Sequence, residues 1–380
     1  MTLVKKTPTI QDVARFAEVS TATVSRALSS PERVSEQTRA RISEAVRVTG
    51  YTPNQSARSL RQRTARTILV ALPDIGNPFF SVILDAVERE AACRGYGVLV
   101  ANRFPGDSSG LLMRDYFMSN RVDGLLLFDG SVDLEQLMML TGDPMPVPLI
   151  VACEEIPDAP FHTVKTDNGY AAEQATRHLI ALGHKRIGHV LGPQGNVLTG
   201  ERQRGYARAM QVAGLEIKPE WLLQGGFAME AGQVAAVHFM GLRDRPTAIF
   251  AANDESAIGF ISGLRQRGLD CPGDVSVVGF DDLELAAHVW PPLTTMRQPR
   301  AALGRIAAGA LIDLIEGERR DRVPMHMVLS SEMIVRGTTG RPPCPDGLGC
   351  GTVGAGCAIA RHKAFPLREN ALNEATALVP

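Results

Sequence analysis

Short apolar runs alternate with amphipathic stretches from residue 67 onward, and this alternation restricts the possible folds more than any other feature of the chain. The runs are TILVALPD (67–74), YGVLVAN (96–102), DGLLLFD (123–129), VPLIVAC (147–153), RIGHVLG (186–192), TAIFAAND (247–254) and VSVVGFDD (275–282). Helical spacing of apolar residues occupies 80–94, 169–182, 203–213 and 256–267. Because strands in series with helices form parallel sheets covered on both faces, the body of the chain is predicted to be α/β.

Polar side chains follow several of these runs, at the point where a parallel strand would end. They are Asp74, Asn77, Asn253, Asp254, Asp281 and Asp282. Ligands of open α/β sheets bind outside the carboxyl ends of the strands. Carboxylates and amides that converge there can satisfy the hydroxyl groups of a polyol, and such a site rejects ligands that leave its own polar groups unpaired. We therefore expect a polyol site, with Phe79, Phe80 and Phe227 available to stack on a sugar or a base.

The first fifty residues have a different pattern, that of three short helices. Thr9 precedes apolar positions spaced three and four apart, which predicts a capped amphipathic helix. Residues 18–20 interrupt the spacing, and a second helix from Ser20 is expected to pack small apolar residues against the first. These residues are Ala22, Val24, Ala27 and Leu28. A third helix follows from Ser35 and stops at Gly50. Two short helices at a tight turn predict a helix-turn-helix unit, whose second helix lies in the major groove of DNA.

The charge distribution favours a nucleic-acid partner for this unit. The whole chain carries −1, but residues 1–66 hold 12 Lys and Arg against 5 Asp and Glu, a net charge of +7. The remaining residues hold 28 against 36, a net charge of −8. A small helical bundle with no DNA role would leave this basic head unexplained. Short Thr and Ser side chains on the second helix would let its backbone approach bases and phosphates, and Arg26 would supply a long donor.

The segments VSTATVSRAL and VSEQTRARISEAVRVTGYTPNQSARSL resemble the DNA-binding head of the LacI/GalR family of bacterial repressors, and the resemblance continues over roughly residues 9–340. It implies an all-α helix-turn-helix head and an α/β periplasmic-binding-protein-like core of two doubly wound parallel-sheet subdomains. The implied domains are a head at 1–53, a hinge helix or linker at 54–66 and an effector-binding core at 67–340. One subdomain would combine 67–165 with 296–328, and the other 166–295 with 329–340. Residues 341–380 extend past the family pattern, and their Pro, Gly and Cys content predicts a disordered tail.

The resemblance also assigns residues to the DNA interface. Those on the first two helices are Thr9, Ser20, Thr21, Ala22, Thr23, Ser25, Arg26 and Ser29. Bases or groove edges would be read by 21–23 and Arg26, while Ser20 and Ser25 would contact phosphates. In the hinge, Asn54, Arg58, Leu60 and Arg61 would lie at the DNA, with the leucine inserted into the minor groove. For the unbound protein, an ordinary flexible linker is the alternative.

Effector contacts in the family correspond here to Asn77, Phe79, Phe80, Asn196, Arg202, Phe227, Asn253 and Asp281. Arg202 and Asp281 carry the strongest expectation, and ion pairs or helix caps are the alternative roles. The segments RTILVALPDIGNPFFS, GHKRIGHVLGP and EMIVRGTTG resemble the cytidine-repressor branch of the family. That resemblance implies a nucleoside of the cytidine or adenosine type acting as inducer, while pentoses, hexoses and purine bases stay open. The chain shows no basic phosphate cradle, which disfavours a nucleotide.

Other functions and partners follow from the same sequence. A homodimer on a palindromic operator, or a tetramer, is the expected assembly. The eight His form no H-x-x-x-H or H-E-x-x-H set and no G-x-S-x-G or Walker sequence occurs, so no catalytic residue is expected. A cytoplasmic α/β sugar-modifying enzyme and a transport-type binding protein are the alternatives from other classes.

Six Cys without metal-ligand spacing predict neither metal nor cofactor. With no apolar run of about 20 residues and a polar start, the chain is expected in the cytoplasm, away from membranes.

Overall fold

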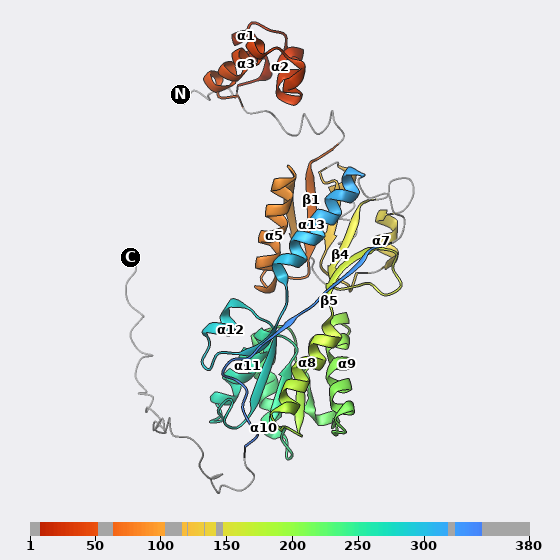
Figure 1. Ribbon diagram of the computed structural model, residues 1–380, viewed down its shortest axis with the longest axis vertical. Helices are drawn as coiled ribbons and strands as arrows, with labels where there is room; N and C mark the ends of the chain where they lie inside the picture. The colour runs from red at the N-terminus through yellow and green to blue at the C-terminus, as the bar shows by residue number, and fades with distance from the viewer. Residues whose placement is uncertain are drawn as a thin grey trace, which may run out of the picture. The chain divides into compact units, whose positions relative to one another are not determined.

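The computed structural model describes residues 8–51, 64–102, 116–119, 121–132, 134–141, 147–317 and 324–343. These residues form an all-α head and two α/β units, as the alternation of patterns predicts (Figure 1). Several expectations fall outside the described residues. They concern the hinge residues Asn54, Arg58, Leu60 and Arg61, and the tail beyond Pro343.

The head consists of α1 (Ile10–Phe16), α2 (Thr21–Ser29), a 3-10 turn (Pro31–Arg33) and α3 (Glu36–Thr49). Val13, Val24 and Ile42, one from each helix, are buried together. Glu18 adopts a left-handed φ of 50° in the turn between α1 and α2, and Arg41 Nη2 donates to the Ala17 carbonyl at 2.6 Å, which ties α3 to that turn. The helix-turn-helix geometry therefore has its own small core.

One detail of the expected head packing is wrong. Ala22 is exposed, whereas Val24 and Ala27 on the same helix are buried. The helical repeat of 3.6 residues turns residue 22 away from the face that holds residues 24 and 27. Ala22 thus has no role in bringing α1 and α2 together, and its methyl group lies on the surface of α2.

The first α/β unit is built on a parallel sheet of six described strands in the order β11-β5-β4-β3-β1-β2. Its elements are β1 (Thr67–Leu72), α5 (Phe79–Cys93), β2 (Gly97–Asn102), β3 (Gly124–Leu127), α7 (Leu134–Thr141), β4 (Leu149–Cys153), β5 (His162–Thr166), α13 (Arg300–Glu316) and β11 (His326–Leu329). Helices α5 and α13 lie side by side over one face, where Val70, Leu126 and Ile150 are buried (Figure 1). Leu69 and Leu125 are buried on the opposite face, with α7.

The second unit has six described strands in the order β12-β10-β9-β8-β6-β7, parallel except for the antiparallel edge strand β12. Its elements are α8 (Asn168–Ala181), β6 (Ile187–Val190), α9 (Val197–Val212), a 3-10 turn (Pro219–Trp221), β7 (Leu222–Leu223), α10 (Met229–Gly241), β8 (Ala248–Ala251), α11 (Asp254–Arg265), β9 (Ser276–Asp281), α12 (Glu284–His288), β10 (Thr294–Arg297) and β12 (Glu332–Ile334). Phe250 and Val278 face α8 and α9, while Ile249 and Val277 face α10 and α11. Both faces are therefore covered.

The chain passes between the two sheets three times, from β5 to α8, from β10 to α13 and from β11 to β12. The boundaries expected near 165, 295 and 328 fall beside these crossings, and the division into domains stays a prediction. The helix expected over 203–213 starts earlier, at Val197. Its first turn contains Gly200, a poor helix former that hides the periodic pattern, and the Asn196 cap stabilises the turn.

Candidate effector site and DNA-binding head

A cavity of about 500 Å³ lies at the carboxyl ends of strands from both sheets. Its lining is Pro73, Asn77, Phe79, Phe80, Phe128, Asp129, Ser131, Cys153, Glu154, Pro193, Gln194, Gly195, Asn196, Leu198, Arg202, Phe227, Asn253, Asp281 and Gln298. All eight residues expected to contact an effector belong to this lining. A volume of this size suits a small organic ligand. The strand-end pattern thus leads to one partly open cavity that both units line.

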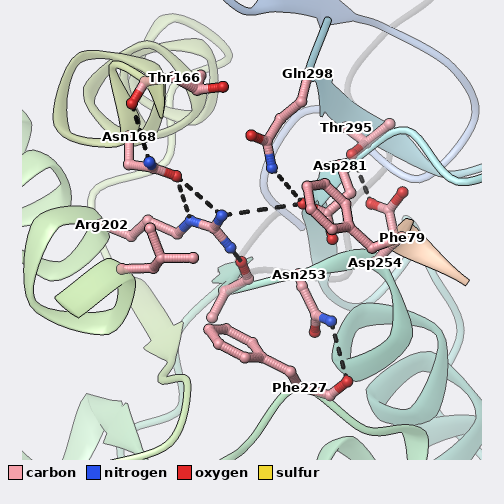
Figure 2. A network of polar contacts seen from close by, with 12 residues as sticks. Phe79, Thr166, Asn168, Arg202, Phe227, Asn253, Asp254, Asp281, Thr295 and Gln298 are labelled. Atoms are coloured by element: carbon pink, nitrogen blue, oxygen red, sulfur yellow. Dashed lines mark hydrogen bonds and ion pairs between the residues drawn. The ribbon is translucent and has the colours of Figure 1, made fainter. Parts of the chain in front are cut away.

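Arg202, on α9, is the central cation of the cavity and is 3% exposed. Its Nε and Nη2 atoms donate to the Asn168 side-chain oxygen at 3.1 and 2.9 Å, and its Nη1 donates to the Ala252 carbonyl at 2.6 Å. Figure 2 shows the guanidinium held between Asn168 and Asp281. Burial lowers the pKa of Arg202, and the nearby Asp281 and Glu154 carboxylates oppose that shift. A guanidinium fixed in this way can orient a polar ligand.

Asp281, at the end of β9, is the anionic partner of Arg202. Its Oδ1 lies 4.0 Å from Arg202 Nη2 and accepts a hydrogen bond from Gln298 Nε2 at 2.7 Å. Burial raises the pKa of Asp281 to about 6, against the opposing effects of Arg202 and Gln298. Its φ of 119° lies in the region that favours glycine, so the chain holds this aspartate at a conformational cost. Strain of that kind fits a carboxylate that is positioned for binding.

Aromatic rings form the apolar part of the lining. Phe79 and Phe80, at the start of α5, meet edge to face at 5.2 Å between centroids, and Phe80 meets Phe128 at 6.0 Å. From the second unit, the Phe227 ring lies 5.7 Å from the Arg202 guanidinium carbon. These rings give the cavity flat apolar surface next to its polar network.

The asparagines of the predicted site serve as helix caps as well as lining residues. Asn196 Oδ1 accepts from the Leu198 and Thr199 amides at the start of α9, and Asn253 Oδ1 accepts from the Ser256 amide at the start of α11. The Asn253 side-chain nitrogen donates to the Phe227 carbonyl at 3.1 Å. Helix capping, the alternative role for such residues, here coexists with a place at the cavity wall.

Sequence reasoning missed several polar residues of the cavity. Asp129, Ser131, Glu154 and Gln298 line it, and Asn168 orients Arg202 from behind. Asp129 and Glu154 directly follow the β3 and β4 runs, so the strand-end pattern that led to Asp281 could have found them. The other residues follow no comparable pattern, because their roles depend on the crossings between sheets.

Most of the head residues expected to bind DNA are at least partly exposed. Thr9, Ser20, Thr21, Ala22 and Arg26 are exposed, and Thr23 and Ser25 are partly exposed. The Ser20 hydroxyl accepts from the Thr23 amide at 3.1 Å, so it also caps α2, and the Thr9 hydroxyl donates to Asp12 at 2.8 Å. Ser29 ends α2, and its side chain lies outside the described part of the chain. The exposed side chains of α2 are therefore mostly short and polar, with Arg26 as the long basic one.

Comparison with known proteins identifies the family. Residues 9–54 match the family model "Bacterial regulatory proteins, lacI family", and residues 176–339 match "Periplasmic binding protein-like domain". The HTH-type transcriptional repressor CytR of Escherichia coli (strain K12) is 37% identical over 337 residues, which cover 87% of this chain and 96% of the relative. The chain belongs to the LacI family of bacterial transcriptional regulators.

Other members of the LacI family support the assignment. The repressor PurR of Photobacterium profundum is 34% identical over 335 residues, 86% of this chain and 97% of the relative. Among solved structures, the lac repressor dimer bound to operator and the anti-inducer ONPF matches with a TM-score of 0.77 and 25% identity, over 88% of this chain and all of that one. The regulator CelR in complex with cellobiose matches with a TM-score of 0.67 and 31% identity, over 87% and 100%.

Membership in the LacI family confirms the predicted fold class and the prediction of a transcriptional repressor rather than an enzyme. LacI-family regulators bind operator DNA and small-molecule effectors, which places the helix-turn-helix head and the cavity in one protein class. In the described part of the chain, no group of three or more His, Cys, Asp or Glu side chains could hold a metal ion. No helix among the described residues is long and apolar enough to cross a membrane.

Proposed function

We propose that this repressor binds a palindromic operator as a homodimer and releases it when a nucleoside of the cytidine or adenosine type enters the cavity. Two copies of the head would read two half-sites, since helix-turn-helix proteins match a two-fold operator with their own symmetry. The observation that carries the effector part is the pairing of the Arg202 and Asp281 polar network with phenylalanine rings in one 500 Å³ cavity.

A nucleoside matches both parts of that lining. Its ribose has adjacent hydroxyl groups, each of which can donate and accept, and these suit the Arg202 guanidinium, the Asp281 carboxylate and the side chains of Asn77 and Asn253. Its base has a flat face, which suits the rings of the phenylalanine cluster and Phe227. The repressors CytR and PurR among the relatives are consistent with a ligand of this kind.

The charges of the cavity argue against a phosphorylated ligand. In its described lining, the acidic side chains are Asp129, Glu154 and Asp281, and the basic one is Arg202. A phosphate group would meet an excess of negative charge in a site with little water to screen it. The neutral nucleoside is therefore favoured over the nucleotide.

The same proposal assigns the DNA contacts. On α2, the exposed Thr21, Ala22 and Arg26, with the partly exposed Thr23, would meet bases and groove edges, and Ser20 and Ser25 would meet phosphates. The domain boundaries after residues 53, 66 and 340 are also part of the proposal, in which the effector core spans 67–340.

A sugar effector is the second candidate. The structural relative CelR binds cellobiose, and another relative, a LacI-family regulator of Enterococcus faecium, carries bound ribose. A pentose or hexose would use the Arg202 and Asp281 network in the same way and would leave part of the aromatic surface uncovered.

Thermal unfolding of the purified full chain with a ligand panel distinguishes these candidates. The panel contains cytidine, uridine, adenosine, inosine, hypoxanthine, ribose and cellobiose. A ligand at a hundred times its Kd adds about 2.7 kcal/mol to the free energy of unfolding, which raises Tm by roughly 5 to 10 °C for a domain of this size. We expect this rise with a nucleoside and none with free ribose. A rise with a sugar or a free base alone would reject the nucleoside.

A further inference from the structure

Glu154 is a buried carboxylate of the cavity that the recognition of ribose leaves without a role. It follows β4 directly, lines the cavity and is 6% exposed. Burying a carboxylate costs free energy unless hydrogen bonds or charges compensate it. Hydrogen-bond donors must therefore compensate this buried carboxylate, and a bound ligand could supply one of them.

Two hydrogen bonds fix the position of the Glu154 side chain. The Gly130 amide donates to Oε2 at 2.7 Å, and the Asn196 side-chain nitrogen donates to Oε1 at 3.2 Å. A Cβ atom at residue 130 would lie 2.9 Å from Glu154 Oε2, so glycine at this position leaves the carboxylate room against the backbone. Each carboxylate oxygen has two lone pairs, and each can accept one hydrogen bond beyond those it already has.

The surroundings of Glu154 favour a hydrogen-bond donor on the ligand. Asp129, two residues beyond the neighbouring strand β3, adds further negative charge, and its Oδ1 accepts from the amide and hydroxyl of Ser131. Burial raises the pKa of Glu154, while the hydrogen bonds from Gly130 and Asn196 lower it. A ligand amino group would satisfy the remaining lone pairs, whereas a carbonyl oxygen would face a carboxylate without a proton between them.

We propose that Glu154 determines the choice of base by accepting a hydrogen bond from an exocyclic amino group, so that the cavity selects cytidine and adenosine over uridine and inosine. This inference rests on the proposed nucleoside effector and adds the group that distinguishes one base from another. Uridine also has a ring N–H, but that group lies between two carbonyl oxygens that would approach the same carboxylate. Inosine has one carbonyl oxygen beside its ring N–H, in the place of the adenosine amino group, and that oxygen would also approach the carboxylate. Both oxo bases are therefore expected to bind less tightly.

Calorimetric titration of the full chain tests the inference with two ligand pairs, cytidine against uridine and adenosine against inosine. A hydrogen bond to a charged group corresponds to roughly a 10- to 100-fold difference in Kd, and we expect the amino member of each pair to bind tighter by that factor. In Glu154→Gln the side chain offers a donor as well as an acceptor, so the ratio of the two Kd values should fall toward one.

The matched control is Glu155→Gln. Glu155 is the next residue, pairs with Lys165 and does not line the cavity, so its substitution should leave the ratio unchanged. If melting shows that Glu154→Gln does not fold, Glu154→Asp replaces it, because it withdraws the carboxylate from the base and should also lower the ratio. Equal affinity for amino and oxo nucleosides, or a ratio that the folded Glu154 variant retains, would overturn the inference and leave the nucleoside effector standing. Binding of cellobiose or ribose without any nucleoside would instead overturn the proposed function.

Discussion

At the residue scale, Arg202 and Asp281 form a buried ion pair in the cavity. Their charged groups are 4.0 Å apart and nearly free of solvent, so each depends on the other and on neutral partners. Asn168 and the Ala252 carbonyl hold the guanidinium, and Gln298 holds the carboxylate. Breaking a buried pair of this kind by removing one partner is strongly destabilising, because the other charge is left uncompensated.

The pKa of Asp281 predicts a pH dependence of effector binding. Burial raises it from 3.8 to about 6, so the carboxyl becomes protonated as the pH falls from 7 to 5. Protonation removes the negative charge of Asp281 and with it an acceptor for the ligand. The affinity for cytidine should therefore fall from pH 7 to pH 5 by up to about tenfold, because the ionised fraction of a group with a pKa of about 6 falls by that factor. Calorimetry at a series of pH values measures the effect. Asp281→Asn should bind more weakly at pH 7 and show a flat profile.

Stability without ligand should respond to the same group with the opposite slope. Because the pKa is raised in the folded state, the unfolded carboxyl ionises first as the pH rises. The contribution of Asp281 to the free energy of unfolding is therefore greatest below its ordinary pKa and falls as the pH rises from about 4 to about 6.

An affinity for cytidine that stays constant from pH 7 to 5 in the wild-type chain would contradict the assigned role of Asp281.

The sequence predicted part of the cavity at the residue scale. Asn77, Asn253 and Asp281 could be found because each lies at or shortly after the end of an apolar run, at the edge where ligands of parallel sheets bind. Glu154 follows such a run as well, so its place at this edge could be predicted from the same pattern, but its burial could not. Its hydrogen bonds from the Gly130 amide and the Asn196 side chain form only in the folded chain.

At the scale of elements, α10 and α11 pack closely through glycines. A Cβ atom on Gly259 would lie 1.9 Å from the Met229 carbonyl oxygen, and one on Gly232 would lie 2.1 Å from the Ser256 carbonyl oxygen. Both obstacles are backbone atoms, which cannot rotate away as a side chain could. The two helices can therefore pack at this distance only with glycine at the points of contact.

Gly259→Ala should destabilise the second α/β unit by about 3 kcal/mol, the upper part of the range for overpacked cores, because α10 and α11 must separate. Denaturant unfolding followed by circular dichroism measures the loss. Gly241→Ala is the matched control, since Gly241 ends α10 and a Cβ atom added there would meet nothing within 4 Å, and we expect a change within about 0.5 kcal/mol. Equal stability of the two variants would show that α10 and α11 can separate without cost.

Elements with strong local patterns were predictable, and elements defined by long-range contacts were not. The strands β1, β3, β4, β8 and β9 are continuous apolar runs, because both faces of their sheets are covered. In contrast, β5 and β10 read HTVKT and TTMR and have no such run. Thr294 and Thr295 in β10 are fully buried. The Thr294 amide donates to the Thr338 hydroxyl, and the Thr294 hydroxyl accepts from the Arg336 amide and shares a hydrogen bond with the Thr339 hydroxyl. These contacts join distant parts of the chain.

The whole molecule separates its charge between two functions. Residues 1–66 carry +7, while the rest of the chain carries −8. The basic part includes the head, whose attraction to phosphates supplies affinity for DNA. The acidic part holds the cavity, where excess carboxylates favour a neutral ligand with hydrogen-bond donors. In the proposed repressor, effector and operator would be coupled because each changes the binding free energy of the other.

Operator affinity measured at increasing cytidine tests this coupling most directly. Operator duplexes are selected from random DNA with the purified full chain, and the Kd of a labelled duplex is followed by fluorescence anisotropy. We predict two chains per near-palindromic duplex and a Kd that rises about 5- to 150-fold with cytidine, the range for a coupling of about 1 to 3 kcal/mol. Arg26→Ala should weaken duplex binding and leave the affinity for cytidine unchanged. An operator Kd that stays constant or falls while cytidine is bound would contradict release by the effector.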